Sequence, residues 1–310
     1  MLEAGLIAFR FLHYGATLSL FGAALFPLYV YRKGFRARTL GEAALFIWLR
    51  RMLLLTALVA LVSLLGWFAF TTGTMAGNAA GIADPKVLLS MIQATDFGPL
   101  WSGRLAAAAV IAALLLRWPS PASLWLTPVL AMFLLASLAG TGHARVTEGW
   151  AGALHVAADA AHLIAAGVWI GGLWPLAFVI ASRNSLAAEK GDVEIGAVLL
   201  KFSGVGYFAV ATLVASGLVN SWFLAGSFGA LISSVYGWLL VAKVSMFLVM
   251  AMLAAANRFW ITPQLARADA SSSGRWLRQL RRHVAAEQAL GLCVLAVVAV
   301  LGTIEPPIPS

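Results

Sequence analysis

Long apolar stretches separated by short polar segments make up almost the whole chain. About 20 apolar residues cross the hydrocarbon core of a bilayer as one helix, and on that scale the pattern predicts eight transmembrane helices. They lie near residues 5–31, 47–71, 99–118, 122–141, 153–181, 202–224, 236–257 and 284–303. We therefore expect an all-α, polytopic helical bundle forming a single transmembrane domain over residues 1–310. The first apolar run is long and lacks a basic region before it, which favours a retained helix over a cleaved signal peptide.

The composition supports a membrane protein and argues against other classes. Hydrophobic residues make up 62% of the chain and charged residues 11%, whereas soluble domains carry roughly 25% charged residues. The net charge of +9 could suit nucleic acid, but most of the Lys and Arg residues sit in a few short loops. The single cysteine, Cys293, excludes a disulfide framework and a Cys-x-x-Cys motif. We expect the lipid bilayer, and no nucleic acid, as the surroundings of this chain.

Basic residues predict which side of the membrane each loop occupies. The segment Arg32 to Arg38 is strongly basic, as is the connection that carries Arg267, Arg275, Arg278, Arg281 and Arg282. Because cytoplasmic loops carry the excess of Lys and Arg, both segments are predicted to be inside. Both termini and the long 72–98 connection, which contains a short amphipathic piece at 87–92, are then outside.

One predicted helix carries an unusual polar stripe formed by His155, Asp159 and His162, which Trp169 prolongs. At 100° per residue, offsets of 4 and 7 bring the first three side chains to within about 60° of one another. Ionisable side chains inside a membrane are expensive, so they face the protein interior or a water-filled cavity. This stripe is the candidate working site.

Other helices carry polar groups at a similar depth. With a rise of 1.5 Å per residue, His162 lies roughly 13 Å from the outer end of its helix and Asp159 roughly 9 Å. His13 comes out at roughly 12 Å and Lys243 at roughly 10 Å on their own helices, and Asn220 is near an outer helix end. We therefore expect four helices to contribute polar groups to the outer half of the membrane.

These residue types suit copper. Imidazoles with a carboxylate suit a borderline ion such as Cu(II), and Met thioethers suit Cu(I). His155 and His162 are about 10 Å apart along the axis, so each needs partners from another helix. His13 is the natural companion of His162. Capture at His143 and His155, followed by transfer to the deeper site, makes a graded path.

Several roles remain open within this cluster. Asp159 is a metal ligand, a partner that orients an imidazole, or the counter-ion of Lys243. An intramembrane histidine can also serve only as a hydrogen-bonding group between helices, and Met75 and Met91 in the outer connection are equally consistent with metal binding and with packing. Trp169 and Asn220 are expected to support the site.

A second polar cluster is predicted on the inside. Asn257 and Arg258 end the seventh helix, and Glu287 lies one turn into the eighth. Glu287 and Arg258 form a structural ion pair in one interpretation, and an inner gate or proton site in the other. The chain has no G-x-x-x-x-G-K-[ST] motif and no phosphorylation-type aspartate motif, which argues against an ATP-driven pump. Nor does it show a nucleophile-plus-base arrangement, so we expect no enzyme.

The order of motifs over roughly 150–305 resembles the CopD-type copper-resistance membrane proteins. The matching segments are His155-x-x-x-Asp159-x-x-His162 with Trp169-x-Gly171-Gly172, Lys201-Phe-Ser-Gly, Ser216-Gly217-Leu-Val-Asn220, Tyr236-Gly-x-x-Leu-x-x-Lys243, Ala-Asn257-Arg258-Phe and Arg281-Arg282-His283-Val-x-x-Glu287. His283 departs from the small polar residue usual in the family, and the N-terminal half matches mainly by hydropathy and His13. The resemblance implies a bacterial inner-membrane protein that handles periplasmic copper, often beside a small periplasmic copper-binding protein of the CopC type.

The resulting expectation is a protein that binds copper, as Cu(I) or Cu(II), from the periplasmic side and moves it inward in copper homeostasis or resistance. The rival hypothesis is a haem-binding redox protein with His13 and His162 as axial ligands between two helices. A third is a membrane scaffold in which the polar stripe only packs helices.

Overall fold

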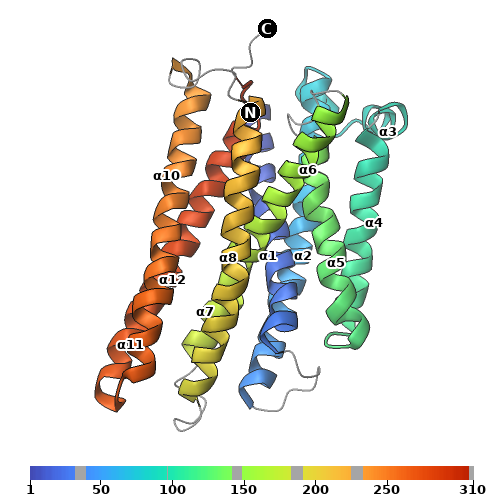
Figure 1. Cartoon of the computed structure of the whole chain (residues 1–310). Coiled ribbons are helices and arrows are strands. Elements are labelled where there is room, and N and C mark those ends of the chain that lie inside the picture. Colours follow the sequence, from blue (N-terminus) through green and yellow to red (C-terminus); the bar gives the residue numbers. More distant parts are fainter. Residues whose placement is uncertain (32–39, 96, 142–148, 183–190, 225–232, 307–310) are drawn as a thin grey trace.

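The computed structural model describes residues 1–31, 40–95, 97–141, 149–182, 191–224 and 233–306. These residues form helices and connections without any strand, and the helices run side by side as one bundle (Figure 1). This confirms the predicted all-α fold. The predicted basic loop from Arg32 to Arg38 lies outside the described residues.

A helix lies at each of the eight predicted positions. Seven helical segments are long and apolar enough to cross a membrane, and the shorter α5 (Pro121–Ser137) occupies the remaining position. Three of the passes contain a break in which the α-helix changes type or direction. The elements are α1 (Leu2–Val30), α2 (Leu40–Met75), α4 (Phe97–Leu116), α5 continued by the 3-10 turn η2 (Leu138–Thr141), α6 (Gly149–Ala166) joined to α7 (Gly172–Ser182) by the π-turn η4 (Gly167–Gly171), α8 (Gly191–Leu224), α10 (Val235–Ala256) joined to α11 (Thr262–Arg267) by the π-turn η6 (Asn257–Ile261), and α12 (Ala270–Leu301).

Several helices extend beyond the ends that hydropathy predicted. Hydropathy marks 47, 202 and 284 as starting points, whereas α2, α8 and α12 begin at Leu40, Gly191 and Ala270. An apolar window detects only the part of a helix that lies in hydrocarbon, and polar residues continue the helix beyond it. Asp269 caps α12, because its Oδ1 accepts a hydrogen bond from Ser272 N at 2.9 Å.

The long connection after α2 contains the amphipathic piece predicted at 87–92. It forms α3 (Pro85–Ala94), preceded by the 3-10 turn η1 (Ala79–Ile82). Asp84 stands at the N-cap and its Oδ1 accepts from Lys86 N at 2.9 Å, while Pro85 opens the first turn. Both are residue types that favour a helix start at these positions.

α1 is the central helix, in contact with α2, α5, α7 and α12. It approaches the π-turn η4 so closely that only glycine fits. A Cβ on Gly22 would lie 2.2 Å from Gly167 O, and one on Gly171 would lie 2.1 Å from Leu18 O. Small residues let membrane helices pack backbone against backbone, and this contact fixes η4 at the centre of the bundle.

The chain returns to the side on which it starts. Figure 1 shows the beginning of α1 and the end of α12 at one end of the bundle, with α11 and the start of α12 at the other. Arg10 Nη1 donates to Gly302 O at 2.7 Å and links α1 to the end of α12. We call the end where α1 begins the outer end and the opposite one, where α11 lies, the inner end, following the predicted topology.

Candidate metal site

A cavity of about 430 Å³ lies in the outer part of the bundle, between α6, α8, α10 and α12. Most of its lining is apolar, and a small number of polar side chains converge on it, as in many ligand sites. The polar side chains are Arg10, Tyr14, His155, Asp159, His162, Trp169, Asn220, Ser221, Tyr236 and Lys243. All four residues of the predicted stripe therefore face one cavity.

The cavity also reaches the surface of the bundle between α8 and α10. Leu218 of α8 and Leu248 of α10 line it, yet they are 69% and 53% exposed. The apolar rim would face acyl chains in a bilayer, so the polar groups inside are accessible only past hydrocarbon on this side.

His155 stands at the outer end of the stripe. Its side chain is buried, and its ring stacks on that of Phe223 from α8, with centroids 4.7 Å apart and planes 14° from parallel. The stacking fixes the orientation of the imidazole where α6 and α8 pack together.

His162 is oriented by a hydrogen bond from a neighbouring helix. Its Nδ1 lies 3.0 Å from Ser216 Oγ, and Ser216 Oγ donates its one hydrogen to Thr212 O at 2.5 Å. The serine oxygen must therefore accept from His162 Nδ1–H. The proton is then on Nδ1, and Nε2 keeps its lone pair, which is the state that a metal ligand requires.

Asp159 receives its direct contact from an amide. Asn220 Nδ2 donates to Asp159 Oδ1 at 3.3 Å, while Lys243 and Tyr236 interact with the carboxylate electrostatically across the cavity. Among the described residues, no hydrogen bond or ion pair joins Asp159 to Lys243. The predicted pair thus lines one cavity without a direct hydrogen bond or ion pair.

His13 faces away from this cavity. It is 1% exposed, its Nδ1 donates to Ala60 O at 3.0 Å, and its ring lies 5.6 Å from that of Trp67, both on α2. The expectation that His13 accompanies His162 is therefore corrected. Helix rise gives the depth of a residue but not the direction of its side chain.

A buried arginine lies beside His13. Arg104 is 0% exposed, donates to Ser137 Oγ at 2.8 Å and Ser137 O at 2.6 Å, and stacks over Trp67 and Trp101 with its carbon 5.7 Å and 5.1 Å from the ring centres. It interacts electrostatically with His13. A fixed positive charge disfavours a metal cation at that imidazole.

The predicted ligands do not form a closed set. Across the described ranges, no three His, Cys, Asp or Glu side chains are close enough together to hold a metal ion. His143, the predicted outermost ligand, lies outside the described residues. His155, Asp159 and His162 line one cavity at successive depths, so each offers donors to an ion without converging on one point.

The predicted inner pair also has a different arrangement. Glu287 is 2% exposed, with Oε2 accepting from Trp169 Nε1 at 3.2 Å and Oε1 accepting from Asn257 Nδ2 at 2.9 Å. Glu287 thus pairs with neutral donors rather than with Arg258.

Two residues that shape the cavity were missed as site residues by sequence reasoning. Ser216 lies in a recognised motif but was not linked to His162, and Arg10 lines the cavity while bonding Gly302 O and, through Nη2, Tyr14 OH at 3.2 Å. Both residues could have been recognised from the sequence, because each is a charged or hydroxyl side chain inside an apolar transmembrane segment.

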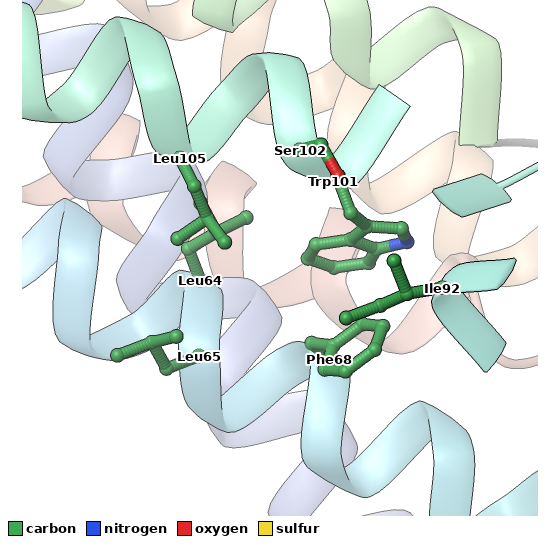
Figure 2. A pocket seen from close by; sticks show the side chains of 7 residues that line it. All are labelled: Leu64, Leu65, Phe68, Ile92, Trp101, Ser102 and Leu105. Carbon is green, nitrogen blue, oxygen red and sulfur yellow. The ribbon is translucent and has the colours of Figure 1, made fainter. Parts of the chain in front are cut away.

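A second, smaller pocket has no side chains that suit a metal site. It measures about 20 Å³, lies between α2, α3 and α4, and is lined by apolar side chains and one hydroxyl (Figure 2). Its lining residues are Leu64, Leu65, Phe68, Ile92, Trp101, Ser102 and Leu105. None of these can ligate a cation strongly, so the large cavity is the candidate site.

The fold and this site define a multi-pass membrane protein with a polar cavity in its outer half. Two family models match the chain: "Copper resistance protein D-like, N-terminal domain" over residues 1–153 and "Copper resistance protein D" over residues 196–301. The chain therefore belongs to the copper resistance protein D family and is a multi-pass protein of the bacterial inner membrane.

Named relatives agree with the family models. The chain is 35% identical to Copper resistance protein D of Pseudomonas syringae pv. tomato, over 97% of this chain and 96% of the relative. It is 30% identical to Inner membrane protein YebZ of Escherichia coli (strain K12), over 99% and 100%. It is 28% identical to Copper transport protein CutJ of Bacillus subtilis (strain 168), over 100% of this chain and 54% of the relative. No solved structure matches the chain.

Proposed function

We propose that this protein takes copper from the periplasmic side of the inner membrane and conducts it toward the cytoplasm, with the cavity of about 430 Å³ as its entry site. The observation that carries the proposal is the meeting of His155, Asp159 and His162 in one cavity of a copper resistance family member. Copper is the cargo here, and imidazole with carboxylate is a donor set that suits it.

The two histidines act in succession. His155 is nearer the outer end and His162 lies seven residues further in, which separates them by about 10 Å along the helix axis. His162 offers the Nε2 lone pair because Ser216 holds its other nitrogen. An ion captured near His155, and in the predicted path first at His143, then passes to His162.

Lys243 keeps the cavity electrically balanced when copper is absent. Its ammonium interacts electrostatically with both Asp159 and His162. A copper ion entering beside Asp159 competes with that ammonium for the carboxylate, so binding and departure of the ion are accompanied by movement of the lysine. Asp159 in this scheme serves both as counter-ion and as ligand or orienting partner.

The source of the copper is a small periplasmic copper-binding protein of the CopC type. This part of the proposal is supported by the family resemblance and by the position of the cavity near the outer end. Positive-inside topology puts that end in the periplasm, because the arginine-rich start of α12 lies at the opposite end.

The haem hypothesis finds no support in this arrangement. Axial ligation requires His13 and His162 to face the two sides of one ring, whereas His13 is bonded to α2 and does not line the cavity. Purified protein is expected to lack a Soret band.

The test is copper bound by purified full-length protein and copper accumulated by cells. His162→Ala and Asp159→Asn are expected to lower the copper affinity of the cavity site and the cellular accumulation of copper by at least tenfold. His155→Ala is expected to slow uptake at low external copper and to leave uptake at high copper nearly unchanged. Cys293→Ser is the matched control, because this exposed thiol is not among the residues that line the cavity and should leave both readouts at the wild-type level. Wild-type copper binding by an Asp159→Asn/His162→Ala double variant would place the site elsewhere.

A further inference from the structure

The inner end of the bundle carries a second set of donor atoms outside the cavity. His283 and Glu287 are four residues apart on α12, so their side chains lie one turn apart on the same face. Between them lies the side chain of Asn257, from the π-turn η6 that follows α10. An imidazole, a carboxylate and an amide from two helices are thus held together.

The amide of Asn257 bridges the other two groups. His283 Nδ1 lies 2.9 Å from Asn257 Oδ1, which can only accept, so the histidine donates. Asn257 Nδ2 donates to Glu287 Oε1 at 2.9 Å. The proton on His283 is therefore on Nδ1, and its Nε2 carries a lone pair.

Glu287 has no cationic partner among the described residues. Its side chain is 2% exposed, and its two oxygens are bonded by the neutral N–H groups of Trp169 and Asn257. A buried carboxylate without a cation is costly, and such groups in membrane proteins mark ion pathways.

The cluster stands directly beyond the end of the cavity. Trp169 and Ile170 are the innermost lining residues from α6 and η4, and Met250 is the innermost from α10. Trp169 lines the cavity and is buried, and its Nε1 donates to Glu287 on the inner side. Both residues that donate hydrogen bonds to Glu287 come from π-turns, which interrupt regular helix packing and are frequent at functional sites.

We propose that His283, Glu287 and Asn257 form an inner copper station, which an ion reaches after it passes Trp169. The donors are an imidazole nitrogen, a carboxylate oxygen and an amide oxygen, a set suited to a borderline divalent ion such as Cu(II). Binding requires the side chains to rearrange: the Asn257 amide releases Glu287, and the His283 ring turns so that its Nε2 lone pair faces the ion beside the carboxylate. The inference rests on the proposed function for the identity of the ion and for its direction.

The experiment counts Cu(II) bound per chain in purified full-length protein and records electron paramagnetic resonance spectra. Wild type is expected to bind two ions with distinct spectra. Glu287→Gln keeps the size of the side chain and one acceptor oxygen but removes the charge, and it is expected to bind one ion. His162→Ala is expected to keep only the inner ion. The Glu287→Gln/His162→Ala double variant is expected to bind none. His283→Ala should also lose the inner signal, whereas Gln288→Leu, at the neighbouring position, should keep both.

The outcomes separate the two hypotheses. Wild-type stoichiometry and spectra in Glu287→Gln and His283→Ala would overturn the inner station and leave the outer site intact. Loss of one ion in Glu287→Gln together with no loss in His162→Ala would support the inner station and overturn the proposed entry site. A lower melting temperature in Glu287→Gln with both ions still bound would make Glu287 a packing residue and contradict the inference.

Discussion

The indole of Trp169 donates its N–H to Glu287 Oε2 at 3.2 Å, across 118 positions of sequence. This hydrogen bond joins the end of the cavity on η4 to the polar cluster on α12. Trp169 also packs edge-on against Phe247 of α10, with ring centroids 6.0 Å apart. One side chain thus ties together the helices that separate the cavity from the inner end.

Trp169→Phe tests this relationship. The change keeps an aromatic ring against Phe247 but removes the only hydrogen bond that the structure gives Glu287 Oε2 among the described residues. Leaving a buried acceptor without its partner should lower the free energy of unfolding by about 1–3 kcal/mol. Thermal unfolding in detergent measures it. Trp222→Phe is the control, since Trp222 is 85% exposed, and equal losses in the two variants would argue against a role for the hydrogen bond.

Ser216→Ala removes the group that fixes the proton on His162 Nδ1. The ring is then free to choose the other tautomer and orientation, so copper affinity is expected to fall by about 10–100-fold while the fold is kept. Copper titration of the purified variant measures this affinity. Ser221→Ala offers a matched comparison, because Ser221 lines the same cavity from the same helix. Unchanged affinity in Ser216→Ala would show that the serine does not orient the ligand.

Lys243→Met should be harmful alone, because it leaves Asp159 as a charge in the cavity with only Asn220 as a direct partner. We expect a loss of about 1–3 kcal/mol in the free energy of unfolding, less than for a buried pair in direct contact. Adding Asp159→Asn should restore stability. Copper accumulation should stay low in the double variant if Asp159 also serves the ion.

Melting temperature and cellular copper content, measured side by side, decide between these roles. A double variant that recovers both readouts would reduce Asp159 to the counter-ion of Lys243. The path would then depend on the histidines alone.

His13→Ala is now expected to affect stability rather than copper binding. The imidazole fills the space between α1 and α2 and bonds Ala60 O, so its removal leaves a buried acceptor and a cavity, costing about 2–4 kcal/mol. Copper bound per folded chain should equal that of wild type. A folded His13→Ala protein that has lost its copper would return His13 to the metal path.

Topology can be tested with reporters that work on one side of the membrane. Alkaline phosphatase fused after Ser310 should be active, since the basic segments place the outer end in the periplasm. The same enzyme inserted at Ala268, between α11 and α12, should be inactive, and a fluorescent cytoplasmic reporter there should be bright. The opposite pattern would invert the bundle and the direction of the copper path.

The sequence alone was sufficient for everything that follows from local periodicity. The apolar runs predict the eight passes, because only a helix satisfies every backbone polar group in hydrocarbon. The stripe of His155, Asp159 and His162 faces one cavity because the rotation per residue of a helix is fixed by its own hydrogen bonds. The amphipathic α3 was likewise encoded by its spacing and by Asp84 at its start.

Only the tertiary structure decided which neighbour each polar side chain meets. His13 has the right depth for His162 but faces α2, since depth along one helix says nothing about the rotation of that helix against another. Glu287 bonds Trp169 and Asn257 instead of Arg258, and Trp169 reaches it from η4, which is 118 positions away in the sequence. Partners across helices depend on the closeness of packing, which here is set by backbone contacts such as Gly22 against Gly167, and no local pattern contains that information.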